Sequence, residues 1–269
     1  VLDFRLDATD PGNEIGYVGL IPGYAATAWH HNLVDRSAWN NDRDAFLDDA
    51  RAFATDEYLP ALVRGHDIDA ARKADVISRM SALTGLSEQY IERSDMRVTL
   101  SRFRTELLRD QGLSVGRFDS RFTGVEPIGV ADSPEGDPSG YGIDGAYTAA
   151  MMDYYTRVLG VDETRPYTTL GGVREWNWDA GPAGGNNNYV NTSVWLERAM
   201  RQNQDLRVLA TNGIYDLATP FFATEMTFNR PGYYDQDRIE LTYYPAGHMM
   251  YLHQPSIEQL AQDVRDFIE

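Results

Sequence analysis

The chain has 269 residues, of which 42% are hydrophobic and 12% aromatic, so it can bury one sizeable core, alone or with a smaller appended domain. Its net charge of −17 repels phosphate backbones, and no apolar run approaches the roughly 20 residues of a membrane span. We therefore expect neither a nucleic acid nor a membrane as a partner. The absence of cysteine excludes disulfides, thiolate catalysis and cysteine-ligated metals.

The first part of the chain predicts a short strand followed mainly by helices. Residues 1–4 are typical of a buried strand, and the apolar stretch over 16–29 is broken by Pro22 and Gly23. Apolar residues at helical spacing then predict helices over about 42–63, 68–83, 99–109 and 143–159, with a short one starting at 87. Because strand-like segments flank this helical block, we expect it to be an inserted cap.

The C-terminal third predicts alternating strands and helices. Strands are expected over 206–211 and 238–244, and helices over 221–228 and 256–268. This order implies parallel strands joined by a helical crossover. We therefore expect residues 1–20 and 165–269 to form part of an α/β core, and residues 21–164 to form the mostly helical cap.

Two polar residues follow these two strands. Asp216 lies in the loop that leaves the first strand, and His248 lies in the loop that leaves the second. Ligands of open α/β sheets bind at the carboxyl ends of the strands, where two such loops can face each other. An acid can then orient an imidazole, which takes a proton from a nucleophile. The chain order, acid before histidine, is that of α/β-hydrolases.

The residues around this pair resemble the serine carboxypeptidase family, especially its bacterial branch. The segment NGIYDLATP over 212–220 is similar to the one that carries the family's catalytic aspartate, and AGHMMY over 246–251 is similar to the one that carries its histidine. Further similar segments lie at 1–4, 106–110 and 116–124, so the likeness covers nearly the whole chain. It implies an α/β-hydrolase fold, present as the C-terminal part of a mostly parallel sheet with a helical cap insertion.

The nucleophile motif of that family, Gly-Glu-Ser-Tyr-Gly, is absent from the chain. The segment over 112–116 matches Gly-x-Ser-x-Gly around Ser114, but a charged helix end precedes it and no helix follows, whereas a nucleophile elbow joins a strand to a helix. We therefore expect the serine on an upstream segment, before Val1. The expected partner is an N-terminal fragment of the same precursor that carries this nucleophile.

Several other residues are candidates for the site. Met249 resembles a residue that lines the family's leaving-group pocket, although an ordinary core methionine fits the pattern as well. His253 is expected to pack near the site. Trp176 and Trp178 fit a substrate cleft and a loop anchor equally well. The pair His30 and His31 has no further ligand at metal spacing, so we expect no metal and no cofactor.

The resemblance implies a serine carboxypeptidase subunit or fragment that removes C-terminal residues from peptide substrates, inactive without its upstream segment. It also implies a secreted or periplasmic location. Three alternatives remain open. The first is another α/β-hydrolase activity, such as an esterase or acyltransferase. The second is an inactive remnant or binding module, and the third is a self-sufficient enzyme that uses Ser114.

Overall fold

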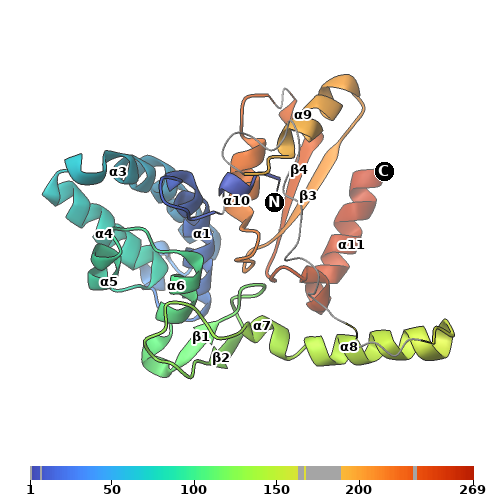
Figure 1. The fold of residues 1–269 in the computed structure, drawn as a ribbon. Helices are drawn as coiled ribbons and strands as arrows, with labels where there is room; N and C mark the ends of the chain where they lie inside the picture. Colours follow the sequence, from blue (N-terminus) through green and yellow to red (C-terminus); the bar gives the residue numbers. More distant parts are fainter. Residues whose placement is uncertain (1, 7, 163–166, 168–188, 233–234) are drawn as a thin grey trace.

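The structure, a computed structural model, describes residues 2–6, 8–162, 167, 189–232 and 235–269. The predicted loop that holds Trp176 and Trp178 lies outside these residues. Figure 1 shows the helices α1 to α6 gathered on one side of the molecule, and the strands β3 and β4 with α9, α10 and α11 on the other. The small sheet of β1 and β2 leads through α7 into α8, which projects from the rest of the chain (Figure 1).

Helix α1 (Glu14–His30) runs through the centre of the helical part. The expected break at Pro22 and Gly23 is wrong, because the helix continues through both residues. Every residue from 16 to 29 is buried. A proline inside a helix costs about 3 kcal/mol, and burial of this many apolar side chains outweighs it. The helix also crosses residue 20, where the boundary between core and cap is expected.

The remaining helices of this part follow the sequence pattern closely. They are α2 (Arg43–Ala52), α3 (Leu59–Arg64), α4 (Ala70–Thr84), α5 (Glu88–Arg93) and α6 (Leu100–Glu106). A π-helical stretch over Phe53–Tyr58 joins α2 to α3. Four of them start at a side chain that accepts a backbone N–H: Asp42, Asp69, Ser87 and Thr99. The helices expected over 42–63, 68–83 and 99–109, and the short one starting at 87, are thus confirmed.

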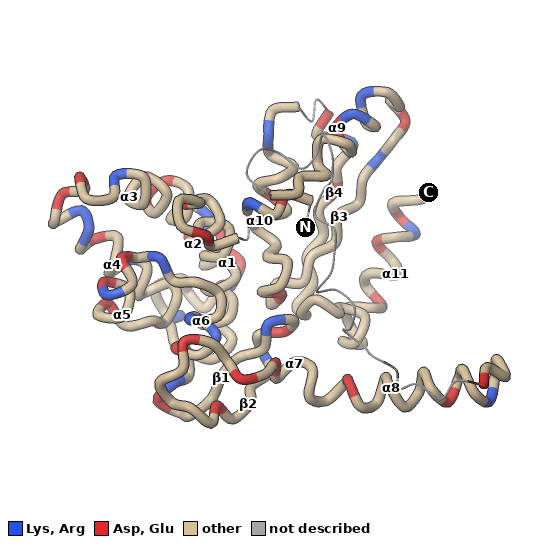
Figure 2. The backbone as a smooth tube through the Cα atoms, in the orientation of Figure 1, with Lys and Arg blue, Asp and Glu red and all other residues tan. Residues whose placement is uncertain are grey.

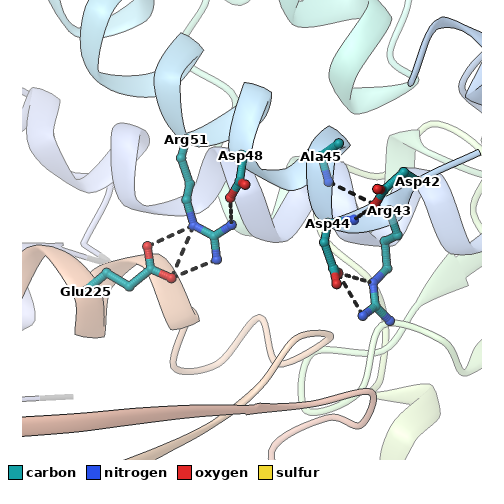
Figure 3. Close-up of polar contacts among 7 residues, drawn as sticks. All are labelled: Asp42, Arg43, Asp44, Ala45, Asp48, Arg51 and Glu225. Atoms are coloured by element: carbon teal, nitrogen blue, oxygen red, sulfur yellow. Dashed lines mark hydrogen bonds and ion pairs between the residues drawn. The ribbon is translucent and has the colours of Figure 1, made fainter. Parts of the chain in front are cut away.

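One apolar core joins the helical part to the strands. Tyr24 stacks on Phe103 with ring centroids 3.8 Å apart in its interior. The same buried cluster includes Leu217 and Phe221, which follow β3 in the chain. At the surface of this contact Arg51 of α2 donates three hydrogen bonds to Glu225 of α10 (Figure 3). The helical part is therefore packed firmly against the elements that carry the candidate site.

The described residues form two sheets of two strands each. Strands β1 (Leu113–Val115) and β2 (Thr123–Val125) are antiparallel. Strands β3 (Val208–Gly213) and β4 (Ile239–Tyr244) are parallel, and α10 (Phe221–Phe228) lies between them in the chain. Helices α9 (Ser193–Gln202) and α11 (Gln254–Ile268) complete this part. The two expected strands, their parallel pairing and the helical crossover are confirmed.

The strand expected at residues 1–4 is wrong for the described residues among them. Asp3 makes only an isolated antiparallel bridge with Asn191, and a 3-10 helix begins at Phe4. Asp3 is buried and forms ion pairs with Arg5 and Arg230. The assignment to the α/β-hydrolase fold remains a prediction.

After β2 and a loop, the chain becomes helical. Helices α7 (Pro138–Tyr141) and α8 (Asp144–Asp153) are followed by a π-helical stretch over Tyr154–Val158. Long tan stretches separate the charged residues of α8 in Figure 2. No residue of α8 is buried. Among the described residues, no helix combines the length and apolarity that a membrane span needs.

Candidate active site

The loop after β3 holds the carboxylate of Asp216 in a fixed orientation. The side chain is 5% exposed, and its Oδ1 atom accepts the backbone N–H groups of Ala218 at 2.8 Å and Thr219 at 3.0 Å. Its Oδ2 atom accepts the hydroxyl of Thr219 and faces the ring of His248. A buried carboxylate that accepts this many hydrogen bonds cannot rotate freely.

The imidazole of His248 completes the pair. Its Nδ1 atom lies 2.8 Å from Oδ2 of Asp216. An ionised carboxylate only accepts hydrogen bonds, so Nδ1 carries the proton and Nε2 of the neutral ring carries the lone pair. Nε2 has no hydrogen-bond partner among the residues that the structure describes. The hydrogen bond that His248 donates to Asp216 raises the pKa of His248, while partial burial of the ring opposes this shift.

A short segment between β1 and β2, residues 116–122, holds both loops. The carbonyl of Phe118 accepts the backbone N–H of His248 at 2.6 Å, and the carbonyl of Arg117 accepts that of Leu217 at 3.0 Å. In return, the N–H of Ser120 donates to the carbonyl of Tyr215 at 3.0 Å. The 116–122 segment thus fixes the position of each loop and the distance between them.

The 116–122 segment is itself attached to α1. The Nε2 atom of His31 lies 2.8 Å from the carbonyl oxygen of Ser120, and the hydroxyls of Thr27 and Ser120 are 2.7 Å apart. Burial lowers the pKa of His31, so its ring is neutral and donates its Nε2 proton to this carbonyl. His30 packs edge-on against Tyr215, with ring centroids 5.4 Å apart. Both histidines thus have structural contacts, and no group of three or more described His, Asp or Glu residues could hold a metal ion.

Two glycines allow the loops to approach this closely. A Cβ atom on Gly247 would lie 2.3 Å from the carbonyl oxygen of Phe118, and one on Gly213 would lie 2.2 Å from the carbonyl oxygen of Gly247. Both distances are far below van der Waals contact, and both clashing atoms belong to the backbone. Glycine is therefore required at both positions for Asp216 and His248 to meet.

Two pockets lie beside Met249, and the larger of them is also lined by His248. The larger, which we name the α8 pocket, has a volume of about 470 Å³. Its described lining consists of Phe118, Asp137, Gly140, Ile143, Asp144, Tyr147, Met151, Tyr167, His248, Met249 and Tyr251. The smaller has a volume of about 140 Å³, and its lining includes Met249 and His253. Met249 therefore lies between two cavities beside the pair, and His253 packs nearby as expected.

Ser114 lies in a setting that does not suit a nucleophile. It is the middle residue of β1, opposite Gly124 of β2, and it is 3% exposed. No helix follows it directly, because β1 leads into the 116–122 segment. The strand-to-helix turn that exposes a nucleophilic serine is absent at this position.

Sequence reasoning singled out Asp216, His248 and Met249, and the structure brings all three to the same place. It did not single out Thr219, which donates to Asp216, or Phe118, which anchors His248. A signal for Phe118 was present, since the segment over 116–124 shares the family resemblance. The role of Phe118 could not be predicted, because its backbone carbonyl, and not its side chain, holds the loop of His248.

Comparison of the chain with protein-family models, with curated proteins and with solved structures finds no match.

Proposed function

We propose that this chain supplies the acid and the general base of a serine carboxypeptidase, which releases C-terminal residues from peptides. The observation that carries this proposal is the contact of 2.8 Å between Nδ1 of His248 and Oδ2 of Asp216, with Nε2 left without a described partner beside a pocket. This arrangement is what a base needs in order to accept a proton from a serine hydroxyl.

The proposed reaction follows from this geometry. Nε2 of His248 takes the hydroxyl proton as the serine oxygen attacks the scissile carbonyl, and Asp216 stabilises the imidazolium that forms. The imidazolium then gives the proton to the leaving amine as the C–N bond breaks, which leaves an acyl-enzyme. Water, deprotonated by the same Nε2 atom, hydrolyses the ester and restores the serine.

The serine is proposed to come from an N-terminal fragment of the same precursor. The described residues offer no nucleophile in contact with Nε2 of His248, and Ser114 is buried in β1. We expect the two polypeptides to co-purify when the precursor is expressed. A single folded, monodisperse species of 30.3 kDa that hydrolyses peptides would contradict the need for a second piece.

The activity is tested on the complex of the two pieces. Blocked dipeptides with a free carboxylate should be hydrolysed in preference to their amides, because a carboxypeptidase recognises the free carboxylate. His248→Ala should lower kcat by at least about 10⁴-fold. His66→Ala is the matched control, since His66 is exposed and lies in the helical part.

The same assays separate the alternatives. Hydrolysis of esters and amides without any preference for the free carboxylate would favour an esterase or acyltransferase on the same pair. Full retention of a binding function in His248→Ala, with no hydrolysis by either protein, would favour an inactive remnant or binding module.

A further inference from the structure

The α8 pocket combines apolar walls with a carboxylate that has no partner among the residues that the structure describes. One wall is a single face of α8: Asp144, Tyr147 and Met151 are spaced i, i+3 and i+7, which places them in line along the helix. Phe118, Met249 and Tyr251 contribute further apolar surface next to His248. The volume of about 470 Å³ is enough for a large side chain.

The two acids of this pocket have different environments. One oxygen of Asp137 accepts the N–H of Arg117 and both donors of Ser139, and it lies 3.6 Å from the guanidinium of Arg104. Asp137 is therefore engaged in holding the backbone. Asp144, in contrast, makes no hydrogen bond or ion pair with any residue that the structure describes. Of the two acids among the described lining residues, it is the one that is available to a ligand.

No lysine or arginine is among the described residues that line the pocket. The guanidinium of Arg117 is close by, 5.6 Å from the ring centroid of Phe118, but it does not line the cavity. The carboxylate of Asp144, which has no partner among the described residues, opposes a bound anion, so this lining disfavours the terminal carboxylate of a peptide. A side chain with a long apolar stem can pack against the apolar walls, and its cationic end can pair with the carboxylate of Asp144.

We propose that the α8 pocket binds a lysine or arginine side chain next to the scissile bond, with Asp144 as the specificity residue. The part of this inference that concerns the scissile bond rests on the proposed function. Binding of the side chain in the pocket does not depend on catalysis. The tyrosine at 147 and the methionines at 151 and 249 contact the stem, while the carboxylate of Asp144 pairs with the cation. Because Asp144 is exposed, the pair is screened by salt, and its effect on affinity is moderate.

The test measures binding by NMR on the chain with methionine methyl groups labelled with ¹³C. The probes are Nα-acetyl-arginine amide and Nα-acetyl-citrulline amide, which have nearly the same shape and differ in charge. The titrations are made at about pH 8.5, above the unperturbed histidine pKa, to limit repulsion from a protonated His248. Both probes should shift the methyl signals of Met151 and Met249, and the arginine probe should bind about threefold more tightly.

Three comparisons decide the result. Asp144→Asn should remove the difference between the two probes, and a high salt concentration should reduce it. Asp153→Asn should leave the difference unchanged, because Asp153 is paired with Arg157 two turns further along and does not line the pocket. Equal binding of the two probes, an unchanged preference in Asp144→Asn, or the absence of any shift of these methyl signals would overturn the proposal.

Failure of the proposed function gives a different outcome. If the complex with the upstream fragment hydrolyses no peptide and the arginine preference persists, the pocket is a binding site for cationic side chains and the peptidase proposal falls. If the complex hydrolyses peptides without regard to lysine or arginine at either side of the bond, and Asp144→Asn changes nothing, the specificity proposal falls alone.

Discussion

His248 is held by Phe118 through both its backbone and its ring. The N–H of His248 donates to the carbonyl of Phe118 at 2.6 Å, and the two rings are packed with centroids 5.3 Å apart. Phe118 thus fixes both the backbone and the ring of the residue that contacts Asp216. A pair of this kind depends on a preorganised backbone as much as on its two side chains.

Gly247→Ala should therefore destabilise the site. The new methyl group would meet the carbonyl oxygen of Phe118 at 2.3 Å, so the loop must move and the backbone hydrogen bond must lengthen. We expect the free energy of unfolding, measured with urea, to fall by about 1–3 kcal/mol. Gly145→Ala is the control, since a Cβ atom there meets nothing within 4 Å and alanine favours the helix. Equal stability of the two variants would contradict the proposed role of this close approach.

The titration of His248 should report its contact with Asp216. In the unmodified chain the pKa of His248 lies above the ordinary value of 6.5, because the carboxylate accepts the Nδ1 hydrogen bond. Asp216→Asn removes the negative charge, so the pKa should fall. The shift is followed by NMR of the ring protons. Asp119→Asn should leave the titration nearly unchanged, since Asp119 is bonded to Arg121.

The same shift predicts how stability depends on pH. A histidine whose pKa is raised by folding stabilises the folded state fully below the unfolded pKa of 6.5, and this contribution is lost as pH rises through the folded pKa. Asp216→Asn should therefore cost more stability at pH 5.5 than at pH 9. A cost that is equal at both pH values would show that protonated His248 does not contribute through this contact.

Ser114 should be unreactive toward a fluorophosphonate. The side chain is 3% exposed in β1, and it lies outside any strand-to-helix turn. We expect no labelling of the isolated chain by mass spectrometry, and labelling on the upstream fragment when the two are together. Labelling of the isolated chain that Ser114→Ala removes would revive the self-sufficient alternative.

The strand pairing and the meeting of Asp216 with His248 could be predicted from the sequence for a physical reason. The two apolar strands and the helix between them leave few arrangements other than a parallel pair, and the loops after such strands end at the same edge. The chain order of the two residues then assigned the acid and the base. The local pattern of strands and helices was sufficient to predict the strand pairing and the meeting of Asp216 with His248, because both follow from the topology.

Other features could not be predicted because they depend on tertiary contacts. Pro22 predicts a helix break locally, but burial on all sides of α1 overrides it. Residues 1–4 have the local pattern of a strand, but the structure buries Asp3 in ion pairs with Arg5 and Arg230, and such contacts are tertiary. The carbonyl of Phe118 accepts the backbone N–H of His248, and a sequence pattern cannot predict this contact because both groups belong to the backbone.

The contact between the helical part and α10 gives a further test. Arg51 of α2 bonds Glu225 at 2.8 and 2.9 Å, and its guanidinium lies over the rings of Phe221 and Tyr243. Both partners are mostly buried, with side chains 25% and 17% exposed. Glu225→Gln leaves the arginine without its main counter-charge, so the free energy of unfolding should fall by about 1–2 kcal/mol.

Asp44→Asn is the matched control for Glu225→Gln, because Asp44 pairs with Arg43 on the same helix but is 79% exposed (Figure 3). Its loss should change the free energy of unfolding by less than about 0.5 kcal/mol. Because α10 begins just after the Asp216 loop, loosening the Arg51 contact should also increase hydrogen exchange in that loop. If Glu225→Gln were no more destabilising than Asp44→Asn, the ion pair would not hold the helical part to the elements that carry the site.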